Sequence, residues 1–128
     1  MEIIAIPSHR EGGLNEKVHP KFGMCESFTF ITIDNNEITQ VKVIENSAAD
    51  ETRSAGTLAA KIVKNNGAEK LIISKLGMNA SMALDALKIE TFKAPKGKIL
   101  VKDLVALYLK GKTKMTPSED LVFDKFLE

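Results

Sequence analysis

The chain of 128 residues contains one cysteine, one tyrosine and no tryptophan. A single cysteine cannot form an internal disulfide, so the cysteine content gives no sign of secretion. No apolar run approaches the roughly 20 residues that a bilayer-spanning helix needs. The first residues also lack the basic and long apolar regions of a signal peptide. We therefore expect a cytoplasmic protein without a membrane partner.

A marked excess of one charge is missing as well. The 18 lysine and arginine residues nearly balance the 17 aspartate and glutamate residues, which leaves a formal net charge of +1. A general nucleic-acid binder would carry a basic stripe, so we expect no nucleic-acid partner. The hydrophobic content of 44% and the charged content of 27% are ordinary for a globular domain.

Short apolar runs between turn-forming residues predict five strands. These runs fall at residues 3–6, 28–33, 38–45, 71–73 and 90–92. Apolar residues at helical spacing predict three helices, at residues 55–66, 80–87 and 101–110. Pro7 is expected to end the first strand, because proline cannot donate a ladder hydrogen bond.

The C-terminal stretch carries its own helix start signal. Residues 116–119 combine a threonine N-cap, a proline at the first helical position and a glutamate three residues after the cap. An apolar stripe at helical spacing follows, made of Val122, Phe123, Phe126 and Leu127. We expect one domain over residues 1–111 and a C-terminal helical extension over residues 112–128.

The order of these elements predicts an α/β fold. A three-strand meander followed by alternating helices and strands implies a five-stranded mixed sheet with helices on both faces. This strand order is that of ribonuclease H. In such a sheet the loops 8–25, 46–54, 74–79 and 94–98 converge on one rim, where ligand sites of open α/β sheets form. The same rim receives the N-termini of the three helices, whose free N–H groups favour anions.

The long polar loop after the first strand gathers the soft metal ligands of the chain. His9, His19 and Cys25 lie within it, and imidazole nitrogen and thiolate are usual ligands of zinc, copper and iron–sulfur sites. Their spacing matches no paired Cys-x-x-Cys motif. The alternative is that both histidines are solvated loop residues and that the cysteine is a small, half-buried residue at a strand start.

Two glycine-containing segments, residues 12–13 and 54–57, can cradle an anion, and the second opens a helix with free N–H groups. Arg53 and Lys75 can add positive charge, although ordinary capping and turn chemistry explains the same residues. We do not expect an enzyme. The first strand lacks the carboxylates of a two-metal nuclease, and no serine stands in a nucleophile elbow.

Several segments together resemble one known family. They are Ile4-Ala5-Ile6-Pro7, Lys17-Val18-His19-Pro20-Lys21-Phe22-Gly23, Val43-Ile44-Glu45-Asn46, Ser54-Ala55-Gly56 and Leu76-Gly77-Met78-Asn79-Ala80. In this order and spacing the chain resembles the dinitrogenase iron–molybdenum cofactor biosynthesis family. Its members are small domains that serve as cofactor carriers and nitrogenase accessory proteins. The family is known for a ribonuclease H-like fold, which agrees with the strand order expected above.

The resemblance implies non-catalytic binding or carriage of an iron–sulfur or iron–molybdenum-type cluster, or of its precursor. The site would lie at the rim formed by loops 8–25, 46–54 and 74–79. The candidate metal ligands are His19, Cys25 and His9. The candidate cofactor-binding residues come from the matching segments and are His19, Lys21, Phe22, Gly23, Ser54, Gly56, Gly77 and Asn79. In the cofactor-carrying members a histidine stands directly before the Phe-Gly pair, where this chain has Lys21.

A second hypothesis remains open beside this one. The chain can be a regulatory or protein-interaction module that keeps the fold and has lost cluster binding. The rim would then bind a small anion or a protein partner, or two copies would form a homodimer through the C-terminal helix. The simplest alternative for the apolar stripe of that helix is that it packs on its own domain.

Overall fold

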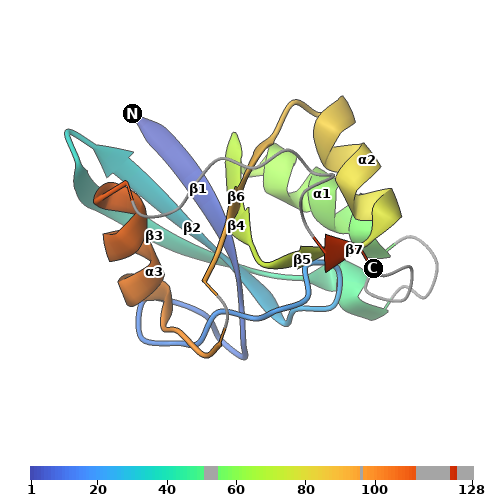
Figure 1. Cartoon of the computed structure of the whole chain (residues 1–128), viewed down its shortest axis with the longest axis horizontal. Helices are drawn as coiled ribbons and strands as arrows, with labels where there is room; N and C mark the ends of the chain where they lie inside the picture. The colour runs from blue at the N-terminus through green and yellow to red at the C-terminus, as the bar shows by residue number, and fades with distance from the viewer. Residues whose placement is uncertain (51–54, 96, 112–121, 124–128) are drawn as a thin grey trace.

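The computed structural model describes residues 1–50, 55–95, 97–111 and 122–123. Its main sheet has the strand order β3-β2-β1-β4-β6 (Figure 1). The strands are β1 (Glu2–Ser8), β2 (Ser27–Asp34), β3 (Glu37–Glu45), β4 (Lys70–Ile73), β5 (Lys75–Leu76), β6 (Glu90–Lys93) and β7 (Val122–Phe123). The helices are the 3-10 helix η1 (Ser47–Asp50) and the α-helices α1 (Ala55–Asn65), α2 (Met78–Ala86) and α3 (Val101–Leu109).

The five strands of the main sheet run as the sequence predicts. β2 is antiparallel to both β1 and β3, whereas β4 is parallel to β1 and to β6. The β2–β3 hairpin turns at Asn35 and Asn36, which both have positive φ angles of 51° and 65°. A two-residue turn of this kind matches the twist of the strands that it joins. The expected mixed α/β sheet is therefore confirmed.

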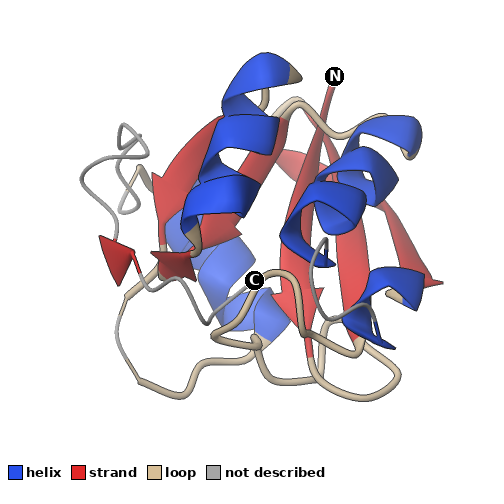
Figure 2. Cartoon of the chain, turned by 90° about the vertical axis from the view of Figure 1, so that its right-hand side faces the viewer, coloured by secondary structure: helices blue, strands red, loops and turns tan. Residues whose placement is uncertain are grey.

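The sheet separates two apolar cores, with helices on both faces (Figure 2). On one face α1 and α2 pack over strand residues such as Phe30 and Leu71. On the other face α3 packs over strand residues such as Ile31 and Ile72. None of the described helices is long and apolar enough to cross a membrane.

The expectation that β1 ends at Pro7 is wrong. β1 does not stop before Pro7 but continues to Ser8. Its pairing with β4 covers only Ile4 and Ala5, so the missing N–H of the proline breaks no ladder bond to that strand. The Pro7 carbonyl instead accepts a hydrogen bond from the His19 N–H at 2.9 Å.

The tail also differs where the structure describes it. Val122 and Phe123 form strand β7, which pairs in parallel with Lys75 and Leu76 of β5. A strand at these two residues contradicts the helix predicted there from apolar spacing. Pairing with a free strand edge has overridden local helix propensity. The rest of the predicted extension lies outside the described residues.

A buried hydroxyl cluster anchors the long loop after β1 to the sheet. The Oγ of Ser8 lies 2.7 Å from the Oγ of Ser27 and 2.9 Å from the Oγ1 of Thr29. The Thr29 Oγ1 also accepts a hydrogen bond from the Gly13 N–H at 2.9 Å. Gly12 lies so close to this cluster that an added Cβ would stand 2.9 Å from the side chains of Ser27, Thr29 and Val43.

We predict that Gly12→Ala destabilises the protein more than Gly13→Ala does. Both glycines have a positive φ, of 69° and 94°, and this alone costs an alanine about 1–2 kcal/mol. Only the Cβ at position 12 also meets neighbouring atoms, which adds about 1–3 kcal/mol of overpacking. Urea unfolding of the two variants measures the difference, and equal losses of unfolding free energy would contradict the close approach at Gly12.

Candidate functional site

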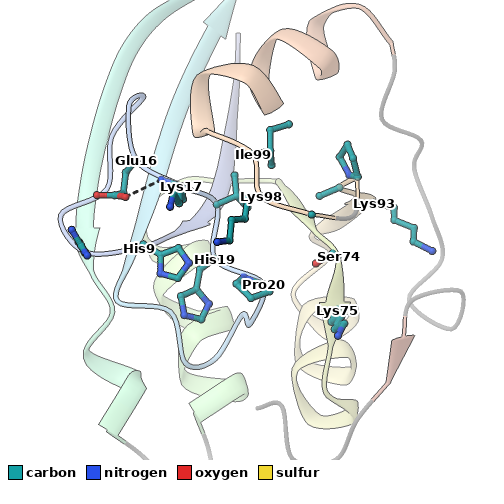
Figure 3. A pocket seen from close by; sticks show the side chains of 15 residues that line it. His9, Glu16, Lys17, His19, Pro20, Ser74, Lys75, Lys93, Lys98 and Ile99 are labelled. Atoms are coloured by element: carbon teal, nitrogen blue, oxygen red, sulfur yellow. Dashed lines mark hydrogen bonds between the residues drawn. The ribbon is translucent and has the colours of Figure 1, made fainter.

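An open cleft of about 930 Å³ lies beside the long loop after β1 (Figure 3). Three separate segments line it. The first comprises residues 9–10 and 16–20 of the loop, the second comprises residues 74–75 at the junction of β4 and β5, and the third comprises residues 93–95 and 97–99 after β6. Loops that follow β1, β4 and β6 therefore meet at one edge of the sheet, as the parallel strand directions predicted.

Main-chain hydrogen bonds hold two of these segments together. The Val18 N–H donates to the Ile99 carbonyl at 2.8 Å. In the first turn of α3, the Val101 N–H donates to the Glu16 carbonyl and the Lys102 N–H to the Leu14 carbonyl, both at 2.9 Å. These bonds use N–H groups that a helix otherwise leaves free. The expectation that the start of α3 offers free N–H groups to an anion is therefore wrong for these two residues.

Positive charge dominates the lining of the cleft. Five cationic residues and one carboxylate line it, namely Arg10, Lys17, Lys75, Lys93, Lys98 and Glu16. Figure 3 shows these lysines on all three segments, with Lys98 pointing toward the histidines. Charges of one sign in a cleft with low-dielectric walls concentrate counter-ions there. The cleft therefore favours an anionic ligand.

His9 and His19 form a contact pair on one wall of the cleft. Their ring centroids are 4.4 Å apart and the ring planes are tilted by 40°. Figure 3 shows both rings beside Pro20. The two histidines that the sequence places ten positions apart are thus brought together, so one ligand can contact both.

Different polar contacts surround the two histidine rings. The Lys21 N–H donates to the Nδ1 of His19 at 3.0 Å, so the proton of the neutral ring resides on Nε2. The Nδ1 of His9 faces the Oε1 of Glu26 at 3.5 Å. A carboxylate on this side keeps the proton on Nδ1 and leaves the Nε2 lone pair for a metal. In this arrangement the Nε2 of His9 can accept a metal and the Nε2–H of His19 can donate a hydrogen bond.

The charge state of the pair follows from its surroundings. Burial, and then the charge of His9 beside it, lower the pKa of His19 below the ordinary histidine value. A hydrogen bond from the Arg10 main chain, together with contacts to His9, lowers the pKa of Glu26. At neutral pH the His19 ring is therefore uncharged and the Glu26 carboxylate is charged.

Cys25 is not brought together with the histidines. Its side chain is fully buried in the core under α1 and α2. The thiol donates a hydrogen bond to the Phe22 carbonyl at 3.2 Å, and burial raises its pKa to about 12. Metal ligation needs a thiolate, and neutral pH leaves this group protonated.

The residues that follow His19 in the loop support the fold. Phe22 is buried in the core, with its ring centroid 5.4 Å from that of Phe28. The Gly23 carbonyl accepts a hydrogen bond from the Nδ2 of Asn46, an amide that is only 4% exposed. Lys21 is exposed and forms an isolated bridge with Lys75. Lys21 therefore lies next to Lys75, which lines the cleft, whereas Phe22 and Gly23 do not line it.

The candidates that open the first two helices lie elsewhere. Gly56 is buried against α2, where an added Cβ would stand 2.8 Å from the Cβ of Ala80, so it allows α1 and α2 to pack closely. Gly77 is the N-cap residue of α2, and Asn79 lies exposed in the first turn of that helix. Neither residue lines the cleft. Ser54 lies outside the described residues.

Sequence reasoning missed much of the positive charge of the cleft and the carboxylate beside His9. Arg10, Lys17, Lys93 and Lys98 were not candidates, and the loop 94–98, although expected at the rim, was not among the loops expected to form the site. A signal was present, because three lysines fall within residues 93–98 around Pro95 and Gly97. Glu26 had no such signal, since its approach to His9 depends on how the loop folds back.

Comparison with known proteins assigns the chain. The model of the dinitrogenase iron-molybdenum cofactor family matches residues 2–111. The chain belongs to this family. Members of the dinitrogenase iron-molybdenum cofactor family take part in the biosynthesis or carriage of that cofactor. An uncharacterized protein of Methanocaldococcus jannaschii is 33% identical over 98 residues, which make up 77% of this chain and 81% of that protein.

Solved structures of similar proteins share the fold. The apo form of the orange protein from Desulfovibrio gigas is 27% identical with a TM-score of 0.79, over 91% of this chain and 93% of that chain. An NMR structure of a Thermotoga protein is 25% identical with a TM-score of 0.74, over 90% of this chain and 93% of that chain. This family member therefore keeps the shared architecture over most of its length.

We predict that the two neighbours of His19 shift its pKa in opposite directions. His9→Gln removes the neighbouring imidazole whose electrostatic effect lowers the His19 pKa, so the pKa should rise towards 6.5. Glu26→Gln removes a charge that raises it, so the pKa should fall further. Imidazole proton resonances followed by NMR against pH measure both values. Shifts of the same sign in the two variants would contradict the geometry of the pair.

Proposed function

We propose that this member of the family binds or carries an anionic metal cluster, of the iron–sulfur or iron–molybdenum type, or its precursor. Binding takes place in the cleft beside the long loop and involves no catalysis. The membership of the chain in the dinitrogenase iron-molybdenum cofactor family supports this proposal. So does a cleft that combines two adjacent imidazoles with five cationic side chains.

The scarcity of protein ligands favours a preformed cluster over a bare metal ion. Within the described part of the chain, no group of three or more histidine, cysteine, aspartate or glutamate side chains is placed to hold a metal. A structural zinc ion requires about four protein ligands. A cluster brings its own sulfide ligands and needs only one or two contacts from the protein. The observation that carries the proposal is therefore that the cleft has only two imidazoles as potential metal ligands but five cationic side chains.

His9 and His19 take different parts in this proposal. The Nε2 of His9 coordinates a metal atom of the cluster, because Glu26 holds the ring proton at Nδ1. The Nε2–H of His19 donates a hydrogen bond to a sulfide or an oxygen of the cluster. A second metal bond, from the Nε2 of His19, would require the ring proton to leave Nε2, and its transfer to Nδ1 would break the hydrogen bond from the Lys21 N–H. In this proposal His9 thus provides one coordination bond and His19 provides one hydrogen bond.

The cationic side chains supply the remaining attraction. Lys93 and Lys98 come from the segment after β6, and Lys17 comes from the loop opposite. Charge attraction needs no fixed bond geometry and weakens as salt rises. A cluster held mainly in this way leaves without breaking several covalent bonds, which suits a carrier.

We predict that anaerobic reconstitution with iron and sulfide gives a visible charge-transfer absorbance that depends on the histidines. His9→Gln should abolish the absorbance and the bound iron, because it removes the metal ligand. His19→Gln should reduce both. Cys25→Ala is the matched control and should retain them, since its thiol lies in the core.

A wild-type protein that takes up no iron and stays colourless would overturn the cluster proposal. It would favour the alternative of a regulatory or protein-interaction module of the same fold. Loss of the absorbance in Cys25→Ala, with the thermal unfolding of the variant unchanged, would contradict the assignment of the ligand to His9.

We predict that lysine variants of the cleft separate charge from coordination. Lys93→Gln and Lys98→Gln should each weaken binding of the reconstituted cluster about tenfold, as expected for one lost charged hydrogen bond. Lys61→Gln on the exposed face of α1 is the control and should change nothing. Affinity is measured by competition with a chelator at two salt concentrations. Equal effects of all three substitutions would show that net charge rather than the cleft controls binding.

A further inference from the structure

The outer edge of β3 has no partner strand among the described residues. β3 ends the sheet, and only β2 pairs with it, along its whole length (Figure 1). Nearly all of its side chains are exposed. Three of them, Ile38, Val41 and Val43, are apolar and 37% exposed each. An unpaired edge with exposed apolar side chains is a template for pairing with another strand.

A bulge in β3 sets which side chains share a face. Ile38 lies opposite Ile33 and Val41 lies opposite Ile31, and both partners face the core under α3. The register shifts between Thr32 and Ile33, so one residue of β3 is extra at this point. Strand side chains alternate between faces, so without the bulge Ile38 and Val41 would lie on opposite faces. With it they share the α3 face.

The same bulge places two opposite charges on the other face. Lys42 lies opposite Phe30, whose ring packs under α1 and α2. The Nζ of Lys42 donates to the Oδ1 of Asn66 at 3.1 Å, which holds the ammonium group on that face. Glu37 lies opposite Asp34 on the same face. Carboxylates directly opposite each other are unfavourable, and no described cation forms an ion pair with either of them.

These placements make residues 37–42 complementary to a second copy of themselves. When two β3 strands pair antiparallel, the α3 faces of the two sheets lie on the same side of the joined sheet. Glu37 then lies opposite Lys42 of the second copy and Ile38 lies opposite its Val41, each pair occurring twice by symmetry. Each pair joins side chains of the same face, and each charge meets an opposite charge.

Charge and side-chain face disfavour two neighbouring symmetric alignments. Centring the contact on Lys42 would place this residue opposite its own copy. Like charges directly opposite each other destabilise a strand pair. Centring the contact on Val41 would place Ile38 opposite Ile44, although Ile38 lies on the α3 face and Ile44 lies on the face of α1 and α2.

We propose that β3 is a self-association edge, through which two copies of the chain join their sheets antiparallel with Glu37 opposite Lys42. This interface differs from the homodimer through the C-terminal helix that the sequence suggests. It uses a different part of the molecule from the cleft and does not depend on the cluster proposal.

Sedimentation equilibrium of the full chain and of charge variants tests the interface. The wild type should show a monomer–dimer equilibrium that weakens as salt rises. Glu37→Lys and Lys42→Glu should each weaken the dimer roughly tenfold, because two attractive pairs become repulsive. An equimolar mixture of the two variants should restore association, because the heterodimer again pairs opposite charges at both places. Glu45→Lys lies outside the register and serves as the control.

Several results would overturn this proposal. A wild type that stays monomeric up to about 1 mM has no such interface. An inert Glu37→Lys would exclude the register, and so would a mixture that associates no better than the single variants. Thermal unfolding of each variant checks that the fold is kept, and the mixture keeps the test decisive even if Lys42→Glu loses its bond to Asn66.

Discussion

The main-chain hydrogen bonds between the long loop and the start of α3 are the constraint on which the candidate site depends. A loop of this length would otherwise sample many conformations. Here the carbonyls of Leu14 and Glu16 accept hydrogen bonds from the first turn of α3, and Val18 bonds to Ile99. The buried hydroxyls of Ser8, Ser27 and Thr29 form hydrogen bonds that hold the same loop on the sheet. His9 and His19 therefore project from a fixed wall.

The net charge of +1 hides a strong separation of charge. The cleft gathers five cationic residues against a single carboxylate. Other carboxylates, such as Glu37 and Glu45 on the edge strand β3, do not line it. The average composition excluded a nucleic-acid binder but gave no sign of this local field. What a ligand meets depends on the charges within a Debye length, about 10 Å at ordinary salt, and not on the total.

The sequence was sufficient for the sheet because burial determines its strands. The continuous apolar run of β1 and the aromatic run of β2 have few alternatives once a core forms. The site was predicted less completely. Loop residues such as Glu26 and Lys98 are positioned by hydrogen bonds between distant segments, Asn46 to Glu26 and Val18 to Ile99, which no local pattern encodes. Cys25 illustrates the same limit, since its place in the sequence fitted a loop ligand equally well as a core residue.

The tail shows where local preference gives way to context. Its capping signal and apolar spacing favour a helix, yet Val122 and Phe123 pair with β5. A two-residue ladder beside Lys75 is enough to replace the expected conformation there. Val122 thereby lies beside Lys75, which lines the cleft.

The burial of Cys25 has a consequence for the chemistry of the whole surface. The chain has no other cysteine, and this thiol is held in the core with its pKa raised to about 12. A protonated, enclosed thiol is a poor nucleophile and a slow partner in disulfide exchange. The folded molecule therefore presents no reactive thiol of its own. The thiols and disulfides of other proteins therefore meet a surface to which they cannot become covalently linked through cysteine.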